Sequence, residues 1–92
     1  MVFKVYSVFD KAIESFGNLL LYRSEAMAKR DFEAAMSGDL VSVSDSYDLF
    51  YIGDFDIKSG IIASNAQMLC VMRGFDIKQR ASVDFDSEME TE

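Results

Sequence analysis

The chain has no histidine, no proline and no tryptophan, and it has a single cysteine among its 92 residues. Without histidine it lacks the commonest general base and the commonest metal ligand. One cysteine forms neither an intrachain disulfide nor a cysteine-based zinc site, which fits a reducing compartment. No glycine–lysine phosphate loop and no dinucleotide-binding fingerprint is present. We therefore expect no enzyme, no catalytic residue, no metal and no other cofactor.

One pair of carboxylates is still placed for acid–base chemistry or for a cation. Asp54 and Asp56 flank Phe55 and point to the same side of a predicted strand. Their spacing is similar to that of a calcium-binding loop, but the glycine and the final acidic residue of such a loop are missing. At a turn, such carboxylates more readily accept hydrogen bonds from backbone amides. We expect both to help to form a turn.

Hydrophobic residues make up 50% of the chain and aromatic residues 13%, which is typical of a globular protein of one domain. The net charge is −7, and five of the 16 acidic residues lie among the last nine residues. We therefore expect a globular domain over residues 1–82 and a flexible acidic tail over residues 83–92. The domain itself is nearly neutral, unlike proteins that bind nucleic acid mainly through phosphate contacts.

The first half of the chain predicts two strands and a helix. Val2–Phe9 is rich in β-branched and aromatic residues, and Asn18–Arg23 is predicted to pair with it. Between them, Asp10 is placed to cap a short helical turn. A helix is predicted over Ser24–Ser37, with a serine N-cap and with Gly38 as a left-handed C-cap. Its apolar stripe consists of Ala28, Phe32, Ala35 and Met36.

The most informative stretch is SYDLFYIGDFDIKSGII, at Ser46–Ile62, which predicts a β-hairpin. Its first strand is the aromatic-rich Leu49–Phe55. The turn that follows gives Gly60 a natural position with positive φ. Ile61–Ser64 is then the returning strand.

Two further segments complete the predicted fold. Val41–Val43 has some strand character, and Gln67–Met72 is an almost continuous apolar run that predicts a strand buried on both faces. Cys70, within this run, is expected to be a buried thiol. The whole pattern predicts an α+β fold in the order β-β-α-β-β-β, with an antiparallel sheet of four to five strands and one helix packed on a face. An open Greek-key barrel of the OB type is the alternative.

Aromatic and basic side chains on the predicted strands are the candidate binding residues. Lys4 and Tyr6 share one face of the first strand, whereas Phe50 and Tyr51 point to opposite faces of the third. Rings on an open sheet face stack on unpaired bases while Lys and Arg bind the phosphates. The same apolar faces also fit a plain core or the interface of a homodimer, which we expect. The candidate nucleic-acid contacts are Lys4, Tyr6, Lys11, Arg23, Lys29, Arg30, Phe50, Tyr51 and Lys58.

The acidic tail has two interpretations. It is a solubilising, disordered end by composition. Its segment VDFD, at Val83–Asp86, is also similar to the acidic, aromatic-containing tails of many single-strand DNA-binding proteins. Such tails compete with nucleic acid for the binding surface and recruit replication partners.

Three segments carry a further pattern. They are KVYSVFDKAIESFG at 4–17, LLLYRSEAMAKRDFEAAM at 19–36 and YDLFYIGDFDIKSGII at 47–62. Their order and spacing resemble the small nonstructural protein of gokushovirus-type microviruses, which are small phages with circular single-stranded DNA. The chain departs from that pattern at Ser44–Ser46, where a Pro-Glu-Asp turn is usual, and after Arg73. The matching elements are Tyr6–Asp10, Ala28–Arg30, Asp48–Leu49, Gly53–Asp56 and Ser59–Gly60.

This resemblance implies a nonstructural phage protein that is made in the cytoplasm of the infected bacterium. The family is commonly labelled as DNA-binding, or as acting in single-stranded DNA synthesis or packaging, and no catalytic residue is attributed to it. We therefore expect binding to single-stranded DNA or to phage or host replication proteins. The alternative is a protein–protein adaptor, for assembly or for a host target, that binds no nucleic acid. With no signal peptide and no apolar run of bilayer length, we expect no membrane contact.

Overall fold

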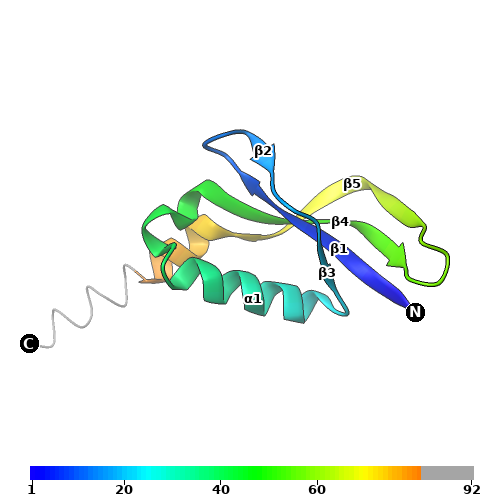
Figure 1. Cartoon of the computed structure of the whole chain (residues 1–92). Helices are drawn as coiled ribbons and strands as arrows, with labels where there is room; N and C mark the ends of the chain where they lie inside the picture. The colour runs from blue at the N-terminus through cyan, green and yellow to red at the C-terminus, as the bar shows by residue number, and fades with distance from the viewer. Residues whose placement is uncertain (82–92) are drawn as a thin grey trace, which may run out of the picture.

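The computed structural model describes residues 1–81, apart from the side chain of Ala66, and shows a curled antiparallel sheet with helices on one side (Figure 1). The predicted acidic tail, with its VDFD segment, lies outside the described residues. The α+β class is confirmed. The elements are β1 (Val2–Asp10), β2 (Ser15–Phe16), β3 (Leu20–Tyr22), α1 (Glu25–Ser37), η1 (Val41–Ser46, a 3-10 helix), β4 (Tyr47–Asp56) and β5 (Ile62–Arg73), followed by a helical segment at 74–81.

Strand β1 is the centre of the sheet. The strand order is β2-β1-β4-β5. Strand β3 pairs with β1 as well, at residues 4–6, whereas β2 pairs with β1 at residues 9 and 10. Every pairing is antiparallel. Within the described residues, β5 pairs with β4 alone, so the sheet curls but does not close into the barrel that was the alternative.

Helix α1 begins as its sequence predicts. The Ser24 hydroxyl accepts a hydrogen bond from the Met27 amide at 3.3 Å, and Glu25 occupies the first turn. The buried residues of α1 are Ala28, Phe32 and Met36. Ala35, expected on the same stripe, is exposed instead. This is a correction, and the helix buries a narrower face than predicted.

The end of α1 also differs from the prediction. Gly38 has φ −92° and ψ −126°, not the left-handed conformation. Its carbonyl accepts a hydrogen bond from the Val41 amide at 3.1 Å and thereby starts η1. The expected strand character of Val41–Val43 is therefore wrong. The Ser44 hydroxyl bonds the Val41 carbonyl at 2.9 Å, and such a local bond competes with sheet pairing.

Two further predictions need correction, one for the helical turn after Asp10 and one for the last two strands. The segment after Asp10 does form a capped turn, because the Asp10 carboxylate accepts from the Ala12 amide at 2.9 Å. Glu14, at φ 54°, then reverses the chain into the hairpin of β1 and β2 rather than into a helical turn. The two strands expected at Ile61–Ser64 and Gln67–Met72 form one strand, β5, whose register against β4 shifts twice, between Leu49 and Phe50 and between Tyr51 and Gly53.

The hydrophobic core lies between α1 and one face of the sheet. Its buried members are Tyr6, Ala28, Phe32, Met36, Leu49 and Ile77. Ile77 comes from the helical segment 74–81, which the sequence did not predict. That segment is held close to η1 by Gly74, where a Cβ atom would overlap the Ser44 carbonyl oxygen. In the part of the chain that the structure describes, no helix has the length and apolarity to cross a membrane.

Candidate functional site

The two faces of the sheet are assigned by strand alternation. Tyr6 packs against α1, so the even-numbered residues of β1 face the helix and the odd-numbered ones face away. Directly paired residues share a face, which puts Tyr51 with Tyr6 and Phe50 with Ser7. The prediction that Phe50 and Tyr51 point to opposite faces is confirmed. We call the side away from α1 the outer face.

Tyr6 is a core residue and not a binding residue, which corrects its place among the candidates. Its side chain is 0% exposed and contacts two other tyrosine rings, with centroids 6.0 Å away for Tyr22 and 5.5 Å away for Tyr51. Burial, followed by the nearby charges of Glu25 and Asp54, raises the pKa of its hydroxyl. That hydroxyl has no hydrogen-bond partner among the described residues. No base can stack on a ring in this position.

Tyr51 is half-buried and forms a polar cluster at the rim of the core. Its hydroxyl donates a hydrogen bond to the Asp54 carboxylate at 2.7 Å, and this bond raises the pKa of Tyr51 to about 12. The Lys4 ammonium lies 5.2 Å from the centroid of the Tyr51 ring, a cation–π distance. Lys4 and Tyr51 are thus brought together as a basic and aromatic pair.

A second such pair lies at the same end of β1 but on the outer face. The Arg23 guanidinium carbon is 5.8 Å from the centroid of the Phe3 ring. Lys58, in the turn from β4 to β5, is close to the N-terminus, because the Ile57 amide bonds the Met1 carbonyl at 3.2 Å. We call Lys4, Arg23, Lys58 and the N-terminal amine the basic end.

The other predicted basic residues are neutralised by carboxylates. Lys11 pairs with Asp48 at 3.6 Å, at the far end of β1 from the basic end. The two candidates on α1 are paired within the helix: Lys29 with Glu25 at 3.2 Å, and Arg30 with Asp31 at 3.8 Å. Of all Lys and Arg residues in the chain, Lys4, Arg23 and Lys58 alone form no ion pair within residues 1–81.

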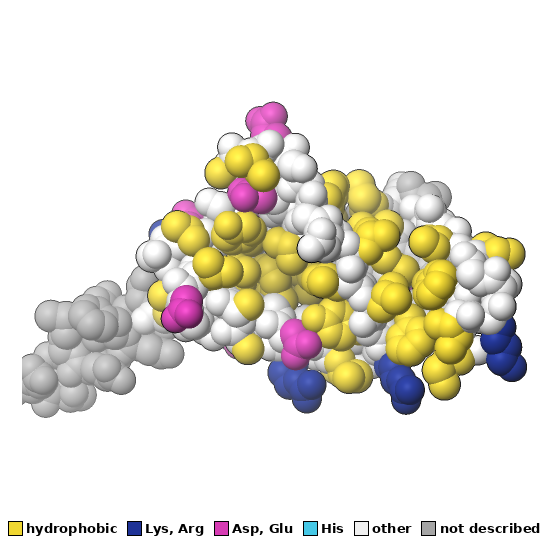
Figure 2. All heavy atoms as spheres, viewed as in Figure 1, with side chains coloured by type: hydrophobic (Ala, Val, Ile, Leu, Met, Phe, Trp, Pro, Cys, Tyr) yellow, Lys and Arg dark blue, Asp and Glu magenta, His cyan; other side chains and the backbone are white. Residues whose placement is uncertain are grey.

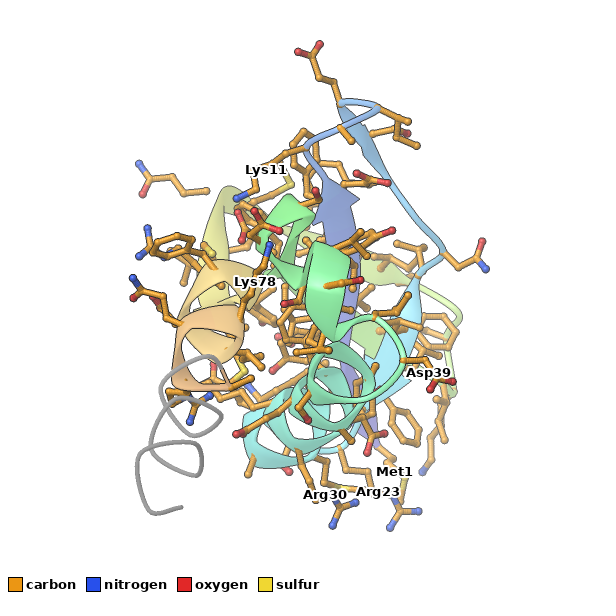
Figure 3. All side chains as sticks on the ribbon, turned by 90° about the vertical axis from the view of Figure 1, so that its left-hand side faces the viewer. Met1, Lys11, Arg23, Arg30, Asp39 and Lys78 are labelled. Atoms are coloured by element: carbon orange, nitrogen blue, oxygen red, sulfur yellow. The ribbon has the colours of Figure 1, made fainter. Side chains whose placement is uncertain are left out.

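Acidic residues that form no ion pair within residues 1–81 lie at both ends of β1. Asp54 and Asp56 lie on β4 beside the basic end, whereas Asp10 and Glu14 lie in the hairpin of β1 and β2 at the opposite end. We call Asp10 and Glu14 the acidic end. Figure 2 shows acidic side chains at the tip of that hairpin and basic side chains at the lower right-hand edge. Figure 3 shows Arg23 close to Met1 and far from Lys11, which lies at the other end of β1.

Phe50 belongs to an aromatic cluster on the outer face. Ring centroids are 4.9 Å apart for Phe9 and Phe16, 5.6 Å for Phe16 and Phe50, and 6.4 Å for Phe9 and Phe50. The cluster has the edge-to-face geometry that aromatic pairs favour. The candidate list omitted Phe9 and Phe16, because Phe16 reaches this face only through strand β2. The alternating apolar residues Phe3, Val5 and Phe9 could have indicated that Phe9 lies on this face.

The two carboxylates of the hairpin have structural partners. The Asp56 carboxylate accepts a hydrogen bond from the Lys58 amide at 2.9 Å, and this bond lowers its pKa. Asp54 accepts from Tyr51. Gly60 has φ 75°, and its amide bonds the Asp56 carbonyl at 2.8 Å. The prediction that these carboxylates form the turn is confirmed for Asp56 and wrong for Asp54, which lies within β4, pairs with Lys4 and Ala63, and accepts from a side chain.

Cys70 is exposed, so its predicted burial is wrong. Cys70 lies in β5, where it pairs with Phe50 of β4, and within residues 1–81 β5 is an edge strand with a neighbour on one side only. Gln67, Met68 and Leu69 are exposed for the same reason, so this run is not buried on both faces. Partial burial and the charge of Asp48 nevertheless raise the pKa of the Cys70 thiol.

The alkylation of Cys70 by iodoacetamide should report this raised pKa. The thiolate is the reactive form, so at pH 8 dilute native protein should react more slowly than the chain unfolded in urea. The rate should reach half its maximum at a higher pH in the native protein. Because the folded state holds this proton more tightly, the associated stability is present below the unfolded pKa and is lost as the pH rises through the folded one. Equal rates at every pH would contradict the prediction.

Comparison with known proteins finds one match. The family model described as Phage ORF5 protein matches residues 3–77, from β1 into the helical segment that carries Ile77. No similar protein was found among the curated proteins or the solved structures.

Proposed function

We propose that this chain, which belongs to the Phage ORF5 protein family, is a nonstructural accessory protein that binds single-stranded DNA, or the complex that replicates and packages it, in the infected bacterium. The family match supports a phage protein. The resemblance to the gokushovirus protein supports the finer role in DNA synthesis.

The basic end is the observation that carries the DNA-binding proposal. Lys4, Arg23 and Lys58 lack carboxylate partners within the described chain, and two of them lie over aromatic rings. Proteins that bind single strands combine positive charge along the backbone path with rings on which bases stack. Tyr51 and Phe3 are half-buried, so their exposed edges are the available ring surface.

The number of free cations sets the expected strength. Three phosphate contacts give a salt dependence of about −2 in log affinity against log salt for single strands. The excess of acidic residues in the rest of the chain repels the phosphates of DNA and weakens its binding. We therefore expect weak binding that is measurable at low salt.

Fluorescence anisotropy with a labelled single-stranded oligonucleotide tests this proposal. A variant with Lys4→Gln, Arg23→Gln and Lys58→Gln should lose at least about tenfold in affinity, with a salt slope close to zero. The control variant carries Lys29→Gln and Arg30→Gln. These substitutions remove basic side chains that already form ion pairs with carboxylates of α1, so the variant should bind DNA almost as the natural protein does.

Equal losses in both variants would mean diffuse electrostatics and no site at the basic end. No binding by the natural protein at low salt would overturn the proposal in favour of the protein–protein adaptor. The net charge of −7 and the apolar outer face favour that second function. Partners that survive nuclease treatment in a pull-down from infected cells would support it.

A further inference from the structure

The outer face of the sheet carries apolar residues from all five strands. Its residues follow from the register with the odd-numbered positions of β1, which include Phe3, Val5 and Phe9. Strand β5 contributes the partners of β4 residues on that face. Besides those of β1, the apolar members are Phe16, Leu21, Phe50, Phe55, Ile62 and Cys70.

The middle of this face is buried, since Val5 is 1% and Ser7 0% exposed, but its margins are open. Figure 1 shows α1 below the sheet, the helical segment 74–81 at its left-hand end, and the hairpin of β1 and β2 rising above it. The exposed fraction is 37% for Phe16, 48% for Leu21 and 49% for Ile62. An antiparallel sheet that faces water normally carries polar residues on that side, so an apolar outer face marks an interaction surface.

Away from the basic end, the chemistry of this face fits a polypeptide and not a nucleic acid. Arg23 lies over the Phe3 ring at the basic end. Elsewhere on the face the register places Arg73, whose guanidinium is held by Asp76 at 3.2 Å. The aromatic cluster adjoins the acidic end, with Asp10 and Glu14 in the neighbouring hairpin. Phosphates would be repelled there.

We propose that a second copy of this chain covers the outer face, with its β1 strand antiparallel to that of the first. Strand β1 runs from the basic end to the acidic end. Stacking two copies antiparallel brings the Glu14 hairpin of each copy over Arg23 and Lys58 of the other, so the dimer and single-stranded DNA compete for these two side chains. Stacking them in parallel would place like charges together.

Two-fold symmetry makes this arrangement self-complementary. Each contact between the two ends occurs twice, and the exposed apolar side chains of one face meet those of the other. Strand β1 is about 30 Å long and packed sheets lie about 10 Å apart, so the raised hairpin reaches toward the end of its partner. Burial of apolar side chains supplies affinity, and the charges at the ends fix the orientation.

Sedimentation velocity over a wide concentration range, without nucleic acid, tests the dimer separately from DNA binding. The natural protein should reach twice its 10.4 kDa chain mass. Phe16→Lys, on the outer face, should abolish the dimer, whereas Met27→Lys, at a similarly exposed position of α1, should preserve it. Circular dichroism checks that both variants fold. A monomer at all concentrations, or a dimer that tolerates Phe16→Lys, would overturn the proposal.

Charge reversal tests the antiparallel arrangement. Glu14→Lys and Arg23→Glu should each raise the dissociation constant about tenfold, since symmetry repeats the new repulsion twice. The double variant should restore the natural value, because opposite charges face each other again. Lysine at position 14 has the same backbone requirement as glutamate, so φ 54° does not confound the comparison. Additive weakening in the double variant would contradict the antiparallel stack.

Discussion

Replacement of Gly74 by alanine should destabilise the fold by about 3 kcal/mol or more. The added Cβ would overlap the Ser44 carbonyl oxygen and would lie 2.5 Å from that of Tyr47. Both obstacles are backbone atoms, and neither moves as a flexible side chain would. Relief requires the helical segment 74–81 to move away from η1, which would expose Ile77, now 3% exposed. Urea denaturation followed by circular dichroism measures the loss.

Gly17→Ala is the matched control for this experiment. A Cβ atom at Gly17 would lie 3.7 Å from the Val8 carbonyl oxygen, which is an ordinary contact. We expect a change below about 1 kcal/mol, within the range of surface substitutions. If both variants unfold at the same urea concentration as the natural protein, the close packing of Gly74 is not a determinant of stability.

Truncation of Tyr6 should be equally damaging, whereas removal of its hydroxyl alone should not. Tyr6→Ala empties the centre of the core and should cost about 3–5 kcal/mol. The hydroxyl of Tyr6 is buried and has no hydrogen-bond partner within residues 1–81, so Tyr6→Phe removes an unsatisfied polar group and should be neutral or stabilising by up to about 1 kcal/mol. Urea midpoints of the two variants give both values.

Tyr51→Phe is the control for the hydroxyl effect. It removes the hydrogen bond to Asp54 and should cost about 0.5–1.5 kcal/mol. The two Tyr→Phe variants should therefore differ in sign or nearly so, although both tyrosines lie in one ring cluster. A loss at Tyr6→Phe as large as at Tyr51→Phe would show that the Tyr6 hydroxyl has a partner.

Local chemistry predicted the parts of the fold that depend on neighbours in sequence. The Ser24 cap, the Gly60 turn and the strand character of β1 each follow from a few adjacent residues, and all three are confirmed. The prediction of strand character at Val41–Val43 was wrong, because the alternation of Val and Ser also suits a 3-10 helix closed by the Ser44 hydroxyl. The prediction that the apolar run in β5 is buried on both faces was wrong, because its position at the edge of the sheet depends on the topology of the whole fold.

At the candidate site, too, the sequence did not reveal which charged side chains are paired and which rings are buried. Sequence alone placed Lys4, Arg23 and Lys58 among nine candidates, but their lack of partners follows from three-dimensional contacts. Lys11 lost its place through an ion pair with Asp48, distant in sequence. Tyr6 lost its place because alternation does not reveal which face the helix covers. These outcomes required the packing of α1 against the sheet.

The pairing of β1 with β4 also governs the order of events during synthesis. Strand β1 emerges first, and β4 begins only at Tyr47, after the whole of α1. At about 5–20 residues per second, the apolar β1 waits for seconds with only β2 and β3 as possible neighbours. Contacts so distant in sequence also slow the final folding step. The central strand is therefore the segment most in need of protection on the ribosome.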